Sequence, residues 1–222
     1  MSSNQVKSKK RVRDHGEVFT PDFIVNDMLN LVKDETERIE SRFLEPACGD
    51  GNFLVPILEK KLEIVKKKYK SSQVEFERSA ILVVSSIYGI ELLHDNVVTC
   101  ISRLYKIVND IYSKLYKNKG KDDFRKSIEF ILNRNILEGN ALNLKTSDDK
   151  NYIVFSEWSF VNGSSIKRRD FEYRELADFD PQKPTLFSLR ELSDTGEAIF
   201  SPMPVKEFPL KHYLKLDYED TK

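Results

Sequence analysis

One ten-residue segment constrains the fold of this chain more than any other. Residues 45–54 read Glu-Pro-Ala-Cys-Gly-Asp-Gly-Asn-Phe-Leu, and an apolar pattern of helical spacing follows them. We therefore predict a short strand over residues 41–46, a glycine turn, and a helix that takes in Leu54. A Gly-x-Gly turn lets a ligand approach the backbone, and the start of a helix offers unpaired N–H groups to an anion. The segment thus predicts a ligand site between a strand and a helix.

Other patterns supply the remaining elements of an α/β fold. Phe19-Thr20-Pro21 indicates a helix start, with Thr20 as the N-cap and Pro21 at the first helical position. After a polar connection over residues 71–79, the apolar stretch 81–93 is expected to be mostly strand, and His94 or Asp95 to cap the helix after it. Further apolar patterns predict helices over residues 97–115 and 124–132 and strands near 135–138 and 152–160.

This alternation predicts a mostly parallel sheet with helices on both faces. Asn162-Gly163 predicts a hairpin after the last strand. We expect residues 1–14 to be a mobile basic tail and residues 15–170 to form the main domain, beginning with an N-terminal helix. Residues 171–222 are punctuated by prolines and are expected to be an irregular C-terminal extension.

Charge leaves DNA binding open without establishing it. The chain has 36 basic and 36 acidic side chains among 222 residues, and residues 171–222 carry 7 of the basic and 11 of the acidic ones. The first 170 residues therefore have an excess of positive charge. Basic clusters lie at residues 7–13, 66–70 and 167–169. Such clusters can neutralise phosphates, but for each one we favour a solvated surface.

Other sequence features exclude several classes of protein. No apolar run reaches the roughly 20 residues of a membrane helix, and no secretory signal is visible, so we expect a cytoplasmic protein without a membrane partner. Cys48 and Cys100 form neither a disulfide framework nor a metal pair, and we expect Cys48 to be a packed residue. The three histidines show no ligand spacing, and we expect no metal site.

A second acidic position strengthens the prediction of a ligand site. Glu91 follows residues 81–90 at the expected end of the next strand. A carboxylate there can accept hydrogen bonds from both hydroxyls of a ribose, although the alternative is a simple exposed strand end. Four segments occur in order along the chain: residues 19–21, 45–54, 88–92 and 138–142. Together they resemble the S-adenosylmethionine-binding half of the N6-adenine DNA methyltransferases, the modification subunits of bacterial restriction systems, over residues 16–145.

The resemblance implies a Rossmann-like methyltransferase fold, with S-adenosylmethionine as cofactor and DNA as partner. It also implies these cofactor contacts: Thr20, Pro21, Gly49 and Gly51 at the methionine end, Glu45 near its amino group, Glu91 at the ribose, Asn140 and Ala141 beside the adenine ring, and Phe19 and Ala47 completing the set. The family often has an aspartate at the position of Asn140. An amide can also exchange hydrogen bonds with the ring.

The resemblance stops at the segment that would carry catalysis. In the family, an Asn or Asp, two prolines and an aromatic residue follow the fourth strand. The side-chain oxygen and a proline carbonyl accept the protons of the adenine amine, and the aromatic ring stacks on the flipped base. This chain contains no such sequence. Glu157 and Trp158 are candidate substitutes at the corresponding place, but we favour a strand that continues into the hairpin.

Three interpretations follow from this resemblance and this difference. The chain is an adenine methyltransferase, or its cofactor-binding part, with target recognition supplied by a second methyltransferase or specificity subunit. Alternatively, it is a degenerate subunit that keeps the fold to regulate or assemble a partner. In the third interpretation the same cofactor serves another amino-group acceptor, such as a protein side chain. The missing segment argues against independent catalysis.

Overall fold

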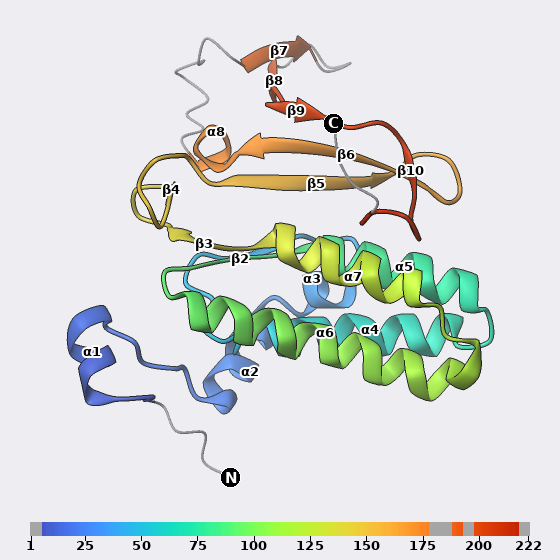
Figure 1. The fold of residues 1–222 in the computed structure, drawn as a ribbon, viewed down its shortest axis with the longest axis horizontal. Helices are drawn as coiled ribbons and strands as arrows, with labels where there is room; N and C mark the ends of the chain where they lie inside the picture. The colour runs from blue at the N-terminus through green and yellow to red at the C-terminus, as the bar shows by residue number, and fades with distance from the viewer. Residues whose placement is uncertain (1–5, 178–187, 193–197, 218–222) are drawn as a thin grey trace.

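Three short parallel strands form the frame of the fold (Figure 1). The computed structural model describes residues 6–177, 188–192 and 198–217. In the first sheet the strand order is β1-β2-β3-β4, in which β1–β3 are parallel and β4 is antiparallel to β3. The strands are β1 (Phe43–Glu45), β2 (Ile87–Glu91), β3 (Ile136–Asn140) and β4 (Lys145–Thr146). The register aligns Glu45 with Gly89 and Glu91 with Glu138, so these carboxyl ends lie at one edge.

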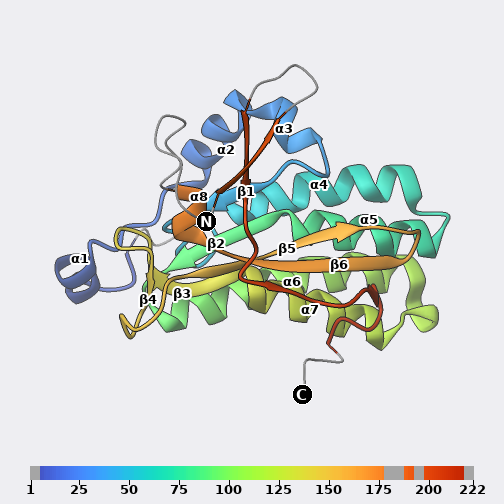
Figure 2. The ribbon, with the colours of Figure 1, turned by 90° about the horizontal axis from the view of Figure 1, so that it is seen from above.

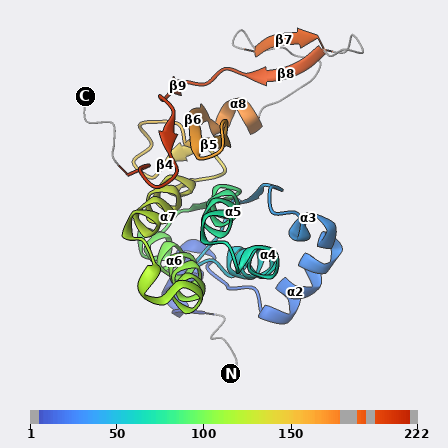
Figure 3. The ribbon, with the colours of Figure 1, turned by 90° about the vertical axis from the view of Figure 1, so that its right-hand side faces the viewer.

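Four helices make the two connections between the parallel strands and supply most of the core. Figure 3 shows them nearly end-on, packed together below a second sheet. They are α4 (Leu54–Tyr69) and α5 (Gln73–Ser85), between β1 and β2, and α6 (His94–Tyr116) and α7 (Asp122–Asn135), between β2 and β3, with the short η1 (Lys117–Lys119) joining the second pair. Their apolar sides are buried together. The helices predicted around residues 54, 97–115 and 124–132 are confirmed.

Helix α5 corrects the prediction of a strand over residues 81–93. It begins at Gln73, so the predicted polar connection is helical too, and only β2 keeps the expected conformation. The apolar residues 80, 81, 83 and 84 are all buried, because α5 lies between α4, α7 and the second sheet. A stretch of helix that is apolar on all sides, as residues 80–84 are, lacks the 3.6-residue period, and a short apolar run then resembles a buried strand.

Three helices precede β1: α1 (Lys9–His15), α2 (Asp22–Leu31) and α3 (Lys33–Glu37). Helix α1 lies where we expected a mobile tail. The Ser8 side chain caps it by accepting from the N–H of Arg11, and Gly16 ends it at a φ of 65°. The predicted caps are wrong by one or two residues. Pro21 is the N-cap of α2 and Leu93 that of α6, and neither helix has a side-chain cap.

The second sheet is built on a long hairpin. The strands β5 (Val154–Phe160) and β6 (Ser165–Glu172) pair antiparallel across the predicted Asn162-Gly163 turn, where Gly163 has a φ of 57°. Seen from above, the hairpin runs along the helices (Figure 2). The later elements are α8 (Tyr173–Ala177), β7 (Ser188–Leu192), β8 (Ala198–Pro202), β9 (Lys206–Glu207) and β10 (Lys211–His212), of which β9 and β10 pair with β6.

The hairpin covers one face of the parallel sheet. Tyr88 and Ile90 of β2 form a buried cluster with Ile153 and Phe155, and the rings of Tyr88 and Phe155 meet edge to face at 5.3 Å. The opposite face of β2 packs on the helices. The expectation of helices on both faces is therefore wrong, because strands cover one of them. The prediction of a mixed α/β protein with a mostly parallel sheet is confirmed.

Part of the C-terminal extension belongs to the core. The boundary expected at residue 170 falls within β6, and Tyr213 and Leu216 are buried with the helices. The prolines at 181 and 184 lie outside the described residues. Among the helices of the described ranges, none combines the length and apolarity needed to cross a bilayer.

A buried carboxylate fastens this extension to the helices. Glu77 of α5 is fully buried and accepts hydrogen bonds from the hydroxyls of Tyr112, at 2.6 Å, and Tyr213, at 2.7 Å. It also accepts from Lys121 Nζ at 2.8 Å and from Gln73. Burial alone would raise the pKa of Glu77, but these donors outweigh it and hold the pKa below its usual value. One charged group thus joins four parts of the chain.

We expect Glu77→Gln to lower the free energy of unfolding by about 3 kcal/mol, because buried donors lose their charged acceptor. The matched control is Glu63→Gln, which removes an exposed ion pair with Lys66 and is expected to cost less than about 1 kcal/mol. Because the folded pKa of Glu77 is lowered, its stabilisation is present at neutral pH and is lost as the pH falls through that value. Urea unfolding of both variants at pH 7 and in acid measures this. Equal losses in the two variants would contradict the assignment.

Candidate functional site

Glu91 and the glycine turn meet at the carboxyl edge of the parallel sheet. The N–H of Gly49 donates to Glu91 Oε2 at 2.9 Å, and the N–H of Leu93 donates to Glu91 Oε1 at 2.9 Å. Glu91 is only 9% exposed. The two positions are 42 residues apart, and the parallel pairing of β1 with β2 brings them together. The side chain is therefore not the exposed strand end that the sequence allowed.

The two glycines of the turn occupy left-handed backbone conformations. Gly49 has a φ of 54° and Gly51 a φ of 97°, which side-chain-bearing residues rarely adopt. A Cβ on Gly49 would lie 3.2 Å from the ring of Phe19, and one on Gly51 would lie 3.0 Å from Cys100 Sγ. Packing inside the protein thus explains both glycines, in addition to the ligand approach that we predicted.

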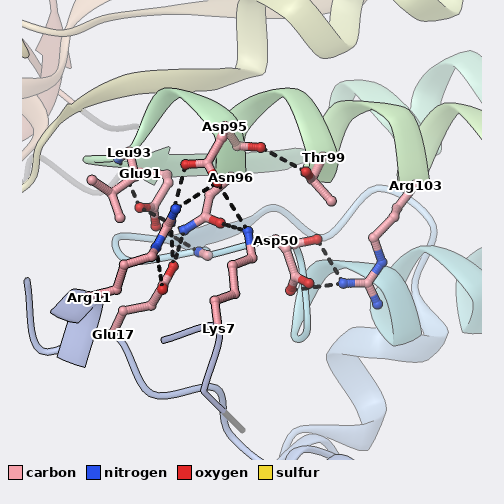
Figure 4. Close-up of polar contacts among 11 residues, drawn as sticks. Lys7, Arg11, Glu17, Asp50, Glu91, Leu93, Asp95, Asn96, Thr99 and Arg103 are labelled. Carbon is pink, nitrogen blue, oxygen red and sulfur yellow. Dashed lines mark hydrogen bonds and ion pairs between the residues drawn. The ribbon is translucent and has the colours of Figure 1, made fainter. Parts of the chain in front are cut away.

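The Phe19-Thr20-Pro21 segment lies against this turn, as its predicted role requires. The ring of Phe19 contacts Gly49, and Asn52 Nδ2 lies 3.4 Å from the carbonyl oxygen of Thr20. Arg103 of α6 also contacts the turn and donates to the carbonyl of Asp50 at 2.8 Å (Figure 4). Its guanidinium is also 2.9 Å from Asp50 Oδ1. The turn is therefore held by two separate segments, residues 19–21 and α6.

The N-terminal arm, residues 7–17, lies beside Glu91 and contacts the first turn of α6 (Figure 4). Arg11 pairs with Glu17 through two contacts of 2.6 and 2.7 Å and with Asp95 at 2.7 Å. These pairs raise the pKa of Arg11, and its hydrogen bonds lower the pKa of Asp95 to about 2. Asn96 Nδ2 donates to Glu17 at 2.7 Å and to Glu91 at 3.3 Å. A continuous chain of polar contacts thus connects the arm to Glu91.

Sequence reasoning missed Glu17, Asn96 and Arg103. Asn96 is fully buried in the first turn of α6, five residues after Glu91. This short distance in sequence from Glu91 was the one signal that could have identified Asn96 as part of the site. Arg11 meets Asp95, 84 residues away, as well as Glu17, and Arg103 meets Asp50, 53 residues away. No local pattern identifies the two distant contacts.

The other predicted cofactor residues lie around the same edge. Glu45 Oε1 accepts from the N–H of Ala47 at 3.2 Å, which holds the carboxylate beside the residues that lead into the turn. Asn140 Oδ1 accepts from the N–H of Leu142 at 2.9 Å. Ala141 packs against the cluster that contains Tyr88, on the face of the sheet that β5 covers. Glu138 of β3 is aligned in register with Glu91 of β2, and Asn140 lies two residues further along β3.

The two candidate substitutes for a catalytic segment have structural roles. Trp158 is 6% exposed, and its indole N–H donates to Asn135 Oδ1 at 3.0 Å. Glu157 pairs with Arg42 at 2.7 Å and with Arg169 at 2.5 Å, and these pairs lower its pKa despite burial. Neither side chain is presented as a base-stacking ring or a free proton acceptor. The favoured interpretation, a strand over residues 154–160, is what the structure shows.

The thiols near the turn are packed rather than reactive. Cys48 and Cys100 are both buried and form no disulfide. A hydrogen bond with Cys100 and burial raise the pKa of Cys48 far above its usual value. A thiolate is the nucleophilic form, so this residue packs beneath the turn, as expected.

The donors and acceptors at this edge fit a nucleoside cofactor. A carboxylate offers about four lone-pair positions, and Gly49, Leu93 and Asn96 fill three of those on Glu91. One ribose hydroxyl can therefore bond to Glu91 directly. A second requires a present donor to move, and Asn96 makes the longest of the three contacts. Two-hydroxyl binding would thus loosen the link to the N-terminal arm.

Comparison with known proteins gives one family match. The model described as "MmeI, DNA-methyltransferase domain" matches residues 24–154, which is more than half of the chain. The match contains the glycine turn, Glu91 and Asn140. No curated protein and no solved structure matches the chain.

We expect Arg11→Ala to release the arm, because Glu17 loses a two-contact partner and Asp95 loses its closest cation. The matched control is Arg13→Ala, whose guanidinium pairs, among the described residues, only with the neighbouring Asp14 at the surface. Hydrogen exchange of residues 9–17 measures the difference, and we expect it to be about tenfold faster in Arg11→Ala than in the control. Equal exchange in the two variants would show that the pairs do not hold the arm.

Proposed function

The chain belongs to the MmeI DNA-methyltransferase domain family, and on that basis we propose that it is an S-adenosylmethionine-dependent DNA methyltransferase-like protein of a restriction–modification system. Its target is the N6 amine of adenine, and it acts in the cytoplasm with a partner that supplies target recognition. The parallel order β1-β2-β3, with a ligand edge at the carboxyl ends, supports a Rossmann-like methyltransferase fold.

The observation that carries this proposal is the junction of Glu91 with the N–H of Gly49. Glu91 receives a ribose hydroxyl, and the Phe19-Thr20-Pro21 segment and the glycine turn border the methionine end. Glu45, whose carboxylate bonds to the N–H of Ala47 at the entry to the same turn, lies near the amino group of the cofactor. Asn140 and Ala141 border the adenine ring. S-adenosylmethionine supplies the methyl group, and these side chains bind and orient it.

The partner also supplies the groups that activate the adenine amine. The sequence lacks the Asn-Pro-Pro-aromatic segment, and Trp158 and Glu157 are held in the core and in ion pairs. The exocyclic amine of adenine is a weak nucleophile, so its protons need well-placed acceptors. We place those acceptors on the second methyltransferase or specificity subunit that completes the enzyme.

The same observation favours one alternative function. A chain that keeps the cofactor junction without the activating segment can serve as a degenerate subunit, which binds the cofactor and regulates or assembles its partner. The two functions differ in one respect. In the first, the methyl group of the cofactor bound to this chain reaches DNA, and in the second it does not.

We expect the purified chain to bind S-adenosylmethionine, and Glu91→Ala to weaken binding by about tenfold to a hundredfold, because a buried hydroxyl loses its acceptor. The matched control is Glu138→Ala, which removes the acid paired in register with Glu91 and is expected to bind within about twofold of the unchanged chain. Isothermal calorimetry measures all three. Circular dichroism checks folding, and Glu91→Gln replaces the alanine variant if that variant unfolds.

No heat from the unchanged chain at saturating cofactor would contradict the proposal. Equal losses in the Glu91 and Glu138 variants would remove Glu91 from the site.

We expect no tritium transfer from labelled cofactor to adenine by this chain alone, because the activating segment is absent. Transfer is expected once a partner with an Asn-Pro-Pro-aromatic segment is added, and Glu91→Ala should then reduce it. Transfer by the isolated chain would refute the partner requirement. Transfer in the complex that survives Glu91→Ala unchanged would favour the degenerate role.

A further inference from the structure

The three basic clusters of the sequence differ in their position in the structure and in the contacts that they make. In residues 167–169, Arg168 is buried over the ring of Phe208, at 3.9 Å, and pairs with Asp170. Its neighbours Lys167 and Arg169 form ion pairs within the same sheet. This cluster is therefore used inside the protein. Residues 66–70 end α4, about 22 Å of helix away from the glycine turn at its start.

The first cluster lies at the candidate site. Helix α1 follows Lys7 and precedes Glu17, and both of these residues contact Asn96. Arg11 fixes the helix to Asp95 of α6, four residues after Glu91, the last residue of β2. Figures 1 and 2 place α1 at the same end of the molecule as β4. The arm thus borders the edge where the cofactor junction lies.

Helix α1 divides its basic residues between two sides. At about 100° per residue, Lys9, Lys10 and Arg13 share one side of the helix, and Arg11 lies on the other. Arg11 is ion-paired with the core, whereas Lys9 and Lys10 are exposed and form no ion pair in the described part of the chain. The Arg13 side chain is 76% exposed, and its one ion pair within the described ranges is with Asp14. The inner side anchors the helix, and the outer side displays cations.

We propose that Lys9, Lys10 and Arg13 contact the phosphate backbone of duplex DNA beside the cofactor site. Lys9 and Arg13 are one helical turn apart, about 6 Å along the axis, and their flexible stems reach neighbouring phosphates of one strand. Ion pairs and two caps hold the helix in place, so little additional ordering is needed when DNA binds. The inference rests on the proposed function for its choice of DNA as the polyanion.

The test is the binding of a fluorescein-labelled 30-base-pair duplex of mixed sequence to the full chain, by anisotropy between 50 and 200 mM KCl. We expect the Lys9→Ala, Lys10→Ala, Arg13→Ala triple variant to bind at least tenfold more weakly. For this variant, the slope of the logarithm of the DNA association constant against the logarithm of the salt concentration should become shallower by about 2 to 3. Each phosphate contact contributes about 0.9 to that slope. The matched control removes three exposed cations remote from the site, by Lys67→Ala, Lys68→Ala and Lys70→Ala, and should bind within about twofold of the unchanged chain.

Calorimetry with S-adenosylmethionine on the same variants separates this inference from the proposed function. Retained cofactor binding with weakened DNA binding in the α1 variant alone supports the inference. Equal DNA binding by both variants, or no duplex binding by the unchanged chain at 50 mM KCl, overturns it. Tighter, α1-dependent binding to phosphatidylserine vesicles than to DNA also overturns it. If the chain binds DNA through α1 but does not bind S-adenosylmethionine, the proposed function is contradicted and the inference about α1 stands.

Discussion

The hydrogen bond from the N–H of Gly49 to Glu91 is the constraint on which this end of the molecule depends. It joins the turn after β1 to the end of β2. It therefore holds the connection from β1 to α4 against the connection from β2 to α6. The same carboxylate accepts from Leu93 at the start of α6 and from Asn96 one turn later. Through Asn96 and Glu17 it also positions the N-terminal arm. A ligand that bonds to Glu91 thus acts on the turn, the helix and the arm together.

Local signals explain what could be predicted from the sequence. The glycine turn, the long helix α6 and the Asn162-Gly163 hairpin each depend on contacts between near neighbours in the chain, and all three are present. Parallel pairing then brings Glu91 to the turn without further information. Helix α5 could not be predicted this way, because its apolar second half is buried almost throughout and has no exposed polar side to mark the helical period.

Long-range electrostatics explain what the sequence could not predict. Residues 7–14 look like a tail until Arg11 meets Asp95 and Glu17, and Asp95 lies 84 residues away. The extension after residue 170 looks irregular until Tyr213 reaches Glu77, 136 residues away. In both segments a few charged hydrogen bonds order a chain whose apolar pattern is weak. The predicted cofactor residues meet at one edge of the parallel sheet, and their individual roles stay predictions.

If the junction of Glu91 and Gly49 is a cofactor site, the amide of Gly49 reports on ligand binding directly. Heteronuclear NMR of the full chain, titrated with S-adenosylhomocysteine, follows that amide together with those of Leu93 and Gly163. A ribose hydroxyl on Glu91 should shift the amide signals of Gly49 and Leu93 with one common dissociation constant and leave that of Gly163, in the distant hairpin turn, unmoved. No shift of Gly49 at saturating ligand, or shifts confined to residues away from this edge, would contradict the account.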